Sequence, residues 1–285
     1  MNLGLSIACG LFSAGTFGAA DFIAKLSTNK IGFLRTALFM QIVGSFFVLP
    51  FAIMDSGRLL TYPSVAVAAV LLGGVNALAT LCLYKSFEIG RLSIVSPVAS
   101  TAPCISILLA VTFLGETMTL PILVGVGAVM VGIVLVTAQT SESGPTIQVA
   151  KGTVYAVGFM LLGGLLLFAI KPVSSVLGPF LSVLILRWGS VPVLIVPYLR
   201  GRLSDRRGSA VKLISGVAFF DTVANLAYIF GLNFGTVTIV SPLAGLASSV
   251  TVLLAWAILK EKLSRHNLAG LIAIAFGVGI LGTFG

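Results

Sequence analysis

Long, continuous apolar stretches dominate this sequence and leave few folds open to it. A helix needs about 20 apolar residues to cross the hydrocarbon core of a bilayer, which is about 30 Å thick. Ten stretches approach or reach that length, at residues 3–24, 33–54, 65–84, 92–113, 120–138, 152–170, 179–199, 211–232, 237–259 and 268–285. They do not alternate apolar and polar residues, which excludes a β-barrel. We therefore predict an all-α integral membrane protein with ten transmembrane helices.

Composition excludes a water-soluble protein. Apolar residues make up 58% of the 285 residues and charged residues only 9%, whereas soluble domains average about 45–50% and about 25%. The three cysteines lie in apolar stretches, there is one histidine, and nucleotide-binding and zinc-protease motifs are absent from the sequence. We therefore predict no metal site, no cofactor and no enzymatic activity.

The net charge of +9 is concentrated in the connections between the stretches. Fourteen of the 17 Lys and Arg residues lie on alternate connections, the opposite connections hold Arg58 and Lys171, and Arg187 lies inside a stretch. Basic connections mark the cytoplasmic side of a membrane protein. We predict a multi-pass protein of the inner or plasma membrane, with both termini on the outer face and no nucleic-acid partner. The first stretch is too long for a cleaved signal peptide, and no positive charge precedes it.

The second half of the chain repeats the first. Residues 90–116 and 235–261 share 12 identities over 27 positions at a constant offset of 145 residues, and the first stretches of the halves align at an offset of 148. We predict two five-helix repeats, 1–138 and 152–285, joined by a linker at 139–151. Because five is odd, the copies would lie upside down relative to each other. Inverted repeats place the substrate site near the midplane, at the interface between the copies.

Sequence motifs recur in both halves at the same spacing. They are Gly90, Ser93-Ile-Val-Ser-Pro97, Pro103, Leu114-Gly-Glu116 and Gly125 with Gly132 in the first half, and Gly235, Ser241-Pro242, Leu259-Lys-Glu261 and Gly270 with Gly277 in the second. With these motifs the chain resembles the EamA-type branch of the drug/metabolite transporter superfamily over essentially its whole length. The resemblance implies a ten-helix carrier of amino acids, nucleotide sugars, sugar phosphates or drugs, often an exporter. It also implies a central cavity lined by the first four helices of each half.

Two ionisable side chains, Arg187 and Asp221, lie near the middle of apolar stretches. A charge at membrane depth costs at least about 2.5–3.5 kcal/mol on insertion scales, so such residues face the bundle interior and indicate a functional site. Consecutive antiparallel helices would bring them together as an ion pair, at the substrate site or as a purely structural bridge. The repeat aligns them with Gln41 and Asn76, which predicts a neutral amide wall opposite a charged wall. Arg187 would bind a substrate carboxylate or phosphate, and Asp221 a substrate amine or a coupling proton.

Five more side chains are candidates for substrate binding because they share helix faces with Asp221 and Asn76 or lie beside Arg187. They are Asn225, Tyr228, Thr80, Tyr84 and Trp188. The alternative for the tyrosines and the amides is a hydrogen bond to a neighbouring helix. Asp21 and Lys25 are four residues apart, and we predict that they pair at the cytoplasmic end of the first stretch.

Prolines predict breaks in the fourth and ninth helices, since a proline inside a helix removes one backbone hydrogen bond. Pro97, Pro103 and Pro242 interrupt these stretches, and Ser96 and Ser241 could bond the freed carbonyl groups. Breaks of this kind line the cavity and act as gates in carriers. We therefore assign gating roles to Pro97, Pro242, Ser96 and Ser241.

Glycines spaced by seven residues predict a closely packed helix face. They are Gly125 with Gly132 and Gly270 with Gly277, and we expect this face to pack within one half or to form a dimer contact. Glu116 and its repeat counterpart are expected to end their helices and dock to a connection.

The function predicted from the sequence is secondary transport. We predict an exporter of small polar metabolites such as amino acids, working by alternating access, with protons as the candidate coupling ion. A drug or sugar-phosphate carrier of the same fold is the alternative. From other classes, the alternatives are a non-transporting membrane scaffold and a membrane-embedded lipid-processing enzyme, which would need clustered acids or histidines. The predicted partners are a small-molecule substrate and the lipid bilayer, with the protein as a monomer or homodimer.

Overall fold

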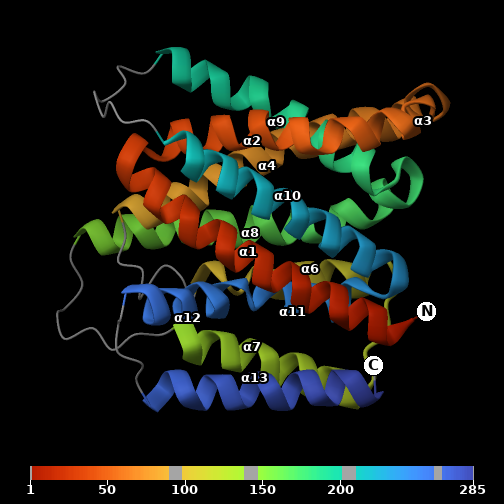
Figure 1. Ribbon diagram of the computed structural model, residues 1–285. Helices are drawn as coiled ribbons and strands as arrows, with labels where there is room; N and C mark the ends of the chain where they lie inside the picture. The colour runs from red at the N-terminus through yellow and green to blue at the C-terminus, as the bar shows by residue number, and fades with distance from the viewer. Residues whose placement is uncertain (1, 90–97, 138–146, 201–209, 260–264, 285) are drawn as a thin grey trace.

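A computed structural model describes residues 2–89, 98–137, 147–200, 210–259 and 265–284 (Figure 1). Within these ranges the chain is helical and contains no strand. The elements are α1 (Leu3–Ile31), α2 (Phe33–Ala52), the short 3-10 helix η1 (Ile53–Asp55), α3 (Gly57–Thr61), α4 (Pro63–Ile89), α6 (Ala102–Phe113), α7 (Leu120–Thr137), α8 (Ile147–Leu177), α9 (Pro179–Arg200), α10 (Val211–Phe234), α11 (Val237–Gly245), α12 (Ala247–Leu259) and α13 (Arg265–Phe284).

Apolar helices of membrane-spanning length account for most of the molecule. In the described ranges six helices are long and apolar enough to cross a membrane, namely α1, α2 with η1, α4, α8, α9 and α10. Four shorter apolar segments lie at Ala102–Phe113, Leu120–Leu135, Val237–Thr251 and Leu268–Leu281, inside the other predicted stretches. The prediction of an all-helical, multi-pass membrane protein is therefore confirmed, and the number of ten spans stays a prediction.

Equivalent tight turns join the first two helices of each half. Gly32 separates α1 from α2 with φ of 89°, and Gly178 separates α8 from α9 with φ of 81°. A positive φ is accessible to glycine because it has no Cβ. A glycine with positive φ directly after a helix is a common way to end that helix. The two glycines are 146 residues apart, so the repeat extends to the geometry of the turn. In Figure 1 the long helices follow a common direction, and both chain termini lie at the same end of the bundle.

The main contacts between helices join the first half of the chain to the second. α1 packs on α10, α4 on α8, α2 on α9, α6 on α8 and α11, and α7 on α13. The two halves are therefore not separate bundles placed side by side. Each helix of one half takes a principal partner from the other, and the core lies between them.

The helix face predicted from glycines seven residues apart lies at the contact between α7 of the first half and α13 of the second. A Cβ on Gly132 of α7 would lie 2.7 Å from the Gly270 carbonyl of α13, and a Cβ on Gly277 would lie 2.6 Å from the Gly125 carbonyl. The expectation of a contact within one half or in a dimer was therefore wrong. The reason is that α7 and α13 come from opposite halves, and their glycines let the two backbones approach closely.

Gly132→Ala is expected to lower the free energy of unfolding by about 1–3 kcal/mol, the usual cost of overpacking. Thermal unfolding in detergent measures this change. The matched control is Gly127→Ala on the same helix, because a Cβ there meets nothing within 4 Å and alanine is the better helix former. Equal stability of the two variants would contradict the close contact of α7 with α13.

Glu116 fastens the connection after α6 to the start of α11. Its carboxylate accepts hydrogen bonds from the backbone N–H groups of Val237 and Thr238, both at 2.9 Å, and from Lys171 Nζ at 2.8 Å. The first N–H groups of a helix lack partners within the helix, and that end of the helix dipole favours an anion. Burial raises the pKa of Glu116, but the bonds from Lys171 and the two backbone groups outweigh it, and the pKa lies below its ordinary value of 4.5. The sequence predicted that Glu116 and Glu261 dock to a connection, whereas Glu116 docks to the first turn of α11 and to Lys171 of α8. Glu261 lies outside the described residues.

Stability should therefore depend on the ionisation of Glu116. Because its pKa is lower in the folded protein, the stabilisation is complete above the unfolded pKa of about 4.5. It is lost as the pH falls through the lower folded value. Glu116→Gln should lower the free energy of unfolding at pH 7 by about 1.5–3 kcal/mol, the range for hydrogen bonds to a charged group, and should flatten the pH dependence below pH 5. Glu88→Gln, which removes an acid in an exposed pair with Lys85, is the control, and an equal loss in that variant would contradict the assignment.

Candidate functional site

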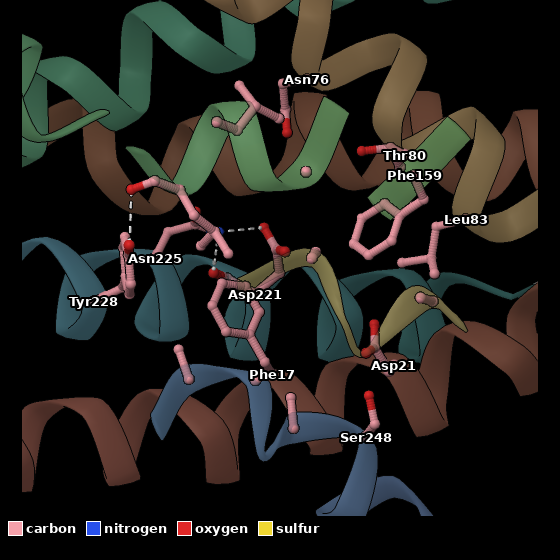
Figure 2. Close-up of a pocket in the computed structure, with 18 of the residues that line it drawn as sticks. Phe17, Asp21, Asn76, Thr80, Leu83, Phe159, Asp221, Asn225, Tyr228 and Ser248 are labelled. Carbon is pink, nitrogen blue, oxygen red and sulfur yellow. Dashed lines mark hydrogen bonds between the residues drawn. The ribbon is translucent and has the colours of Figure 1, made fainter. Parts of the chain in front are cut away.

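A cavity of about 200 Å³ lies between the two halves (Figure 2). Its described lining comes from α1, α2, α4 and the region around the start of α6 in the first half, and from α8 to α12 in the second. Aromatic side chains such as Phe17 and Phe159 line it together with the carboxylates of Asp21 and Asp221. The cavity therefore offers apolar surface with a few polar groups, which is the usual composition of a small-molecule site.

The walls of the cavity are built from equivalent residues of the two repeats. Eight lining residues of α4 and of the region around the start of α6 have a lining counterpart 145 positions later in the chain. The pairs are Asn76 and Asp221, Thr80 and Asn225, Leu83 and Tyr228, Tyr84 and Ile229, Ala99 and Ala244, Ser100 and Gly245, Ala102 and Ala247, and Pro103 and Ser248. This offset is the one that aligns the sequence motifs, so the same positions of both copies face a common space.

Helix breaks occur at equivalent positions beside the cavity. α11 ends at Gly245 and α12 begins at Ala247, and α6 begins at Ala102 after a turn at Ser100. Pro103 lies in the first turn of α6, where a missing N–H costs nothing. Irregular backbone at membrane depth is tolerated where it is buried in protein or lines a cavity. Both breaks line the cavity, since Ser100 and Ala102 flank the first break and Gly245 and Ala247 flank the second.

The residues assigned to gating are described in one half only. Pro242 lies inside α11, three residues before the break. The Ser241 hydroxyl does not bond a freed carbonyl. It lies 2.7 Å from the Tyr228 hydroxyl, whose own proton is donated to the Leu167 carbonyl at 2.7 Å, so Ser241 is the donor of that bond. Ser96 and Pro97 lie outside the described residues.

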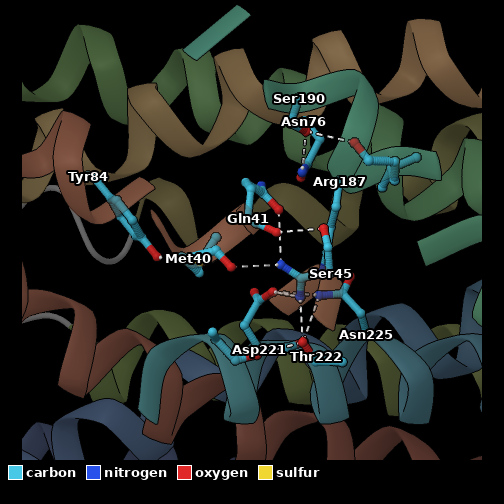
Figure 3. Close-up of polar contacts among 12 residues, drawn as sticks. Met40, Gln41, Ser45, Asn76, Tyr84, Arg187, Ser190, Asp221, Thr222 and Asn225 are labelled. Atoms are coloured by element: carbon cyan, nitrogen blue, oxygen red, sulfur yellow. Dashed lines mark hydrogen bonds and ion pairs between the residues drawn. The ribbon is translucent and has the colours of Figure 1, made fainter. Parts of the chain in front are cut away.

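Arg187 is the centre of a buried polar network (Figure 3). The residue is 2% exposed. Its Nη2 donates to Asp221 Oδ2 at 2.6 Å and to Thr222 Oγ1 at 2.8 Å, and its Nη1 donates to Gln41 Oε1 at 3.0 Å. Gly44 makes room for the guanidinium, because a Cβ there would lie 2.6 Å from its central carbon. The predicted ion pair thus joins α9 to α10 and, through Gln41, to α2.

Neither Arg187 nor Gln41 appears in the described lining of the cavity. Both lie behind Asp221, and the two terminal nitrogens of Arg187 are already bonded to protein oxygens. The expectation that Arg187 receives a substrate carboxylate or phosphate therefore does not match its position. The physical reason is that a guanidinium at membrane depth needs protein acceptors around it. Gln41, Asp221 and Thr222 supply them to the terminal nitrogens, while the buried Nε has no hydrogen-bond partner among the described residues.

Asp221 faces the cavity with its side chain 20% exposed. The bonds that its carboxylate accepts from described residues reach Oδ2, from Arg187 and from Asn225 Nδ2 at 3.3 Å. Its charge is compensated from behind by Arg187, while its surface remains accessible from the cavity. Asn225 also donates to the Asp221 carbonyl at 2.8 Å, which orients the amide.

Four other predicted residues line the cavity and one does not. Asn76, Thr80, Tyr84 and Tyr228 belong to the lining. Asn76 Nδ2 donates to Ser190 Oγ at 3.1 Å, and the Tyr84 hydroxyl donates to Met40 Sδ at 3.2 Å, so both also connect helices.

Trp188 is 57% exposed and lies on an outer groove between α2 and α9, away from the predicted site. Successive residues of a helix point about 100° apart. Trp188, the residue after the buried Arg187, therefore points in a different direction and faces outward.

Asp21 was not predicted to belong to the site, yet it lines the cavity. The sequence suggested an ion pair with Lys25, and among the described residues Asp21 forms no ion pair. Its position within the first apolar stretch was the signal that could have revealed it, because an acid inside a span is functional by default. The four-residue spacing to Lys25 pointed to the wrong partner.

Comparisons with known proteins agree with this architecture. The model of the EamA-like transporter family matches residues 4–138 and 150–283. An uncharacterized protein of Methanocaldococcus jannaschii is 29% identical over 130 residues, which is 46% of this chain and 94% of that protein. A solved crystal structure of a protein with 16% sequence identity covers 96% of this chain and 95% of its own, with a TM-score of 0.75. At that identity the structural likeness concerns the fold.

Removing the Asp221 charge should leave the buried Arg187 guanidinium without a counter-ion. We expect Asp221→Asn to lower the free energy of unfolding by about 3–5 kcal/mol, the usual cost of breaking a buried pair. The double variant Arg187→Gln with Asp221→Asn should recover part of that loss. Unfolding of the two single variants and the double variant in detergent forms a double-mutant cycle. Strictly additive effects would mean that the two side chains are not coupled.

Proposed function

The chain belongs to the EamA-like transporter family and is a multi-pass membrane protein, and from that premise we propose how it works. It is a secondary transporter that moves a small polar solute through the central cavity by alternating access. In this proposal the ten apolar segments are ten spans, and residues 1–138 and 152–285 form two five-helix repeats of inverted topology. No cofactor and no chemical reaction are involved.

The observation that carries the proposal is the pairing of equivalent residues around the cavity. Those eight pairs, separated by 145 positions, face the same space, as expected when a site lies at the interface of two inverted repeats. The packing of helices supports the same symmetry. α1 packs on α10 while its counterpart α8 packs on α4, and α2 and α7 pack on their own counterparts α9 and α13. A two-fold axis through the cavity explains these exchanged contacts.

The size and chemistry of the cavity favour a small solute. Its volume of about 200 Å³ lies below the about 300–1,000 Å³ typical of pockets for drug-sized ligands. This argues against a drug carrier. A sugar phosphate needs a cation, and the described lining contains no Lys or Arg. A small metabolite with a positively charged or neutral polar group fits better.

The proposal also covers the orientation of the protein in the membrane and the ion that drives transport. In this proposal the end of the bundle with the basic connections faces the cytoplasm, as the rule for Lys and Arg favours, and both termini lie on the outer face of the inner or plasma membrane. Net movement is export, driven by protons that exchange at the carboxylates of the cavity. The lining carboxylates Asp21 and Asp221 are the groups able to bind a proton at membrane depth.

Counterflow in liposomes tests the transport function. The purified protein should accelerate exchange of at least one labelled solute from a panel of amino acids, amines and sugars, and an inward proton gradient should stimulate its export. Ser248→Phe, which fills the cavity, should reduce the rate at least tenfold. Ser64→Phe on the exposed surface of α4 is the matched control. Absence of flux for every solute would favour the scaffold alternative.

A further inference from the structure

We propose that Asp21 binds the ammonium group of the transported solute and that the solute is an organic amine without a free carboxylate. This inference rests on the proposed transport function and names the substrate class of the same cavity. It concerns a residue that lies outside the sequence motifs shared by the two repeats. Three observations carry it: the position of Asp21, the distribution of charge in the lining, and the polarity of the two walls.

The position of α1 holds Asp21 at the cavity. One turn before Asp21, Gly18 lies so close to α12 that a Cβ would lie 2.7 Å from the Ala247 carbonyl. Thr251 Oγ1 donates to the Gly18 carbonyl at 3.1 Å. These contacts bring α1 against α12 at this level. Asp21, three residues after Gly18, and Ser248, the residue after Ala247, both line the cavity (Figure 2).

The two carboxylates of the cavity differ in their partners. Asp221 is neutralised by Arg187 at 2.6 Å. Among the described residues Asp21 forms no ion pair and its carboxylate accepts no hydrogen bond, and Lys25 does not reach it. An ionised carboxylate taken out of bulk water is costly unless a cation or hydrogen bonds compensate it. A cationic ligand supplies that compensation.

The same distribution of charge excludes a free carboxylate on the solute. The described lining holds two acids and no Lys or Arg, and the one guanidinium nearby is enclosed behind Asp221. A zwitterionic amino acid would bring its own carboxylate close to these two acids with no cation in the described lining to pair with it. Like charges in juxtaposition cost several kcal/mol and are a common means of rejecting a wrong ligand.

The two walls of the cavity differ in polarity. α1 and α10 pack together and carry Asp21 and Asp221, whereas α4 and α8 pack together and contribute neutral side chains such as Thr80 and Phe159. In Figure 2 the labelled residues of α4 and α8 lie across the cavity from Asp21. A solute with an ammonium at one end and an apolar body at the other matches this arrangement. Phe17 lies on the acidic side, where an aromatic face also attracts a cation.

Binding of three ligands with the same ring tests the proposal. 2-Phenylethylamine, phenylalanine and 3-phenylpropionate carry an amine, both groups and a carboxylate, respectively. Calorimetric titration of the full-length protein in detergent should give a dissociation constant for the amine at least tenfold lower than for phenylalanine, with no binding of 3-phenylpropionate. This comparison uses the unaltered protein and does not depend on the folding of any variant.

Variants of Asp21 identify the group that is responsible. Asp21→Asn should weaken amine binding at least tenfold, and Asp21→Glu should retain a measurable part of it. Because Asp21 forms no ion pair with any described residue, its neutralisation is expected to leave folding intact. Glu88→Gln, an exposed acid on α4, should bind the amine as tightly as the unaltered protein.

The outcomes separate this inference from the transport function. Equal affinity for the amine and the amino acid, or unchanged amine binding in Asp21→Asn, would overturn the inference. If labelled phenylalanine or another acid crosses liposomes while the amine neither binds nor crosses, the inference fails and the transport function stands. If the amine binds through Asp21 but no solute crosses, the site assignment holds and the transport function fails.

Discussion

Polar groups at membrane depth must find partners inside the protein, because hydrocarbon supplies none. Much of this structure follows from that constraint. The guanidinium of Arg187 gathers acceptors from α2 and α10. Tyr228 links α8 to α11 through the Leu167 carbonyl and Ser241. Outside the spans the same rule applies to a helix end, where Glu116 accepts the first N–H groups of α11. The contacts of Arg187 with Gln41 and of Glu116 with Val237 join helices from opposite halves of the chain, so satisfying polar groups also assembles the bundle.

Close packing of helix backbones at glycine residues also holds the two halves together. Helices in lipid gain little from burying apolar surface, since lipid tails are as apolar as their side chains, and they associate through van der Waals contact between closely approaching backbones. α7 and α13 meet in this way at Gly132 and Gly277, and α4 meets α9 where Gly73 faces Gly189. These contacts connect the halves outside the cavity.

The duplication explains both the symmetry of the cavity and its polarity. Repeated positions produce equivalent walls, as with Ala99 and Ala244. Divergence between the copies then makes the walls different. Asn76 in the first copy corresponds to Asp221 in the second, and Asp21 corresponds to Ala169 at the offset of the first helices. Because α1 packs on α10, two substitutions in different copies place both acids on one side. A symmetric scaffold thus acquires a charged face without a change of fold.

The sequence by itself determined the membrane class, the repeat, the helix breaks near Pro103 and Pro242, and the pairing of Arg187 with Asp221. Apolar length, motif spacing and the cost of an isolated charge in lipid are properties of the chain that need no tertiary information. Only the tertiary structure decided which way the side chains face. It placed Arg187 behind the cavity wall, Trp188 on the outer surface, Asp21 at the cavity and the glycines of α7 against those of α13. The reason is physical: in a bilayer the inner and outer faces of a helix are both largely apolar. The hydrophobic pattern that orients a helix in a soluble protein is therefore too weak here, and orientation is set by contacts between helices.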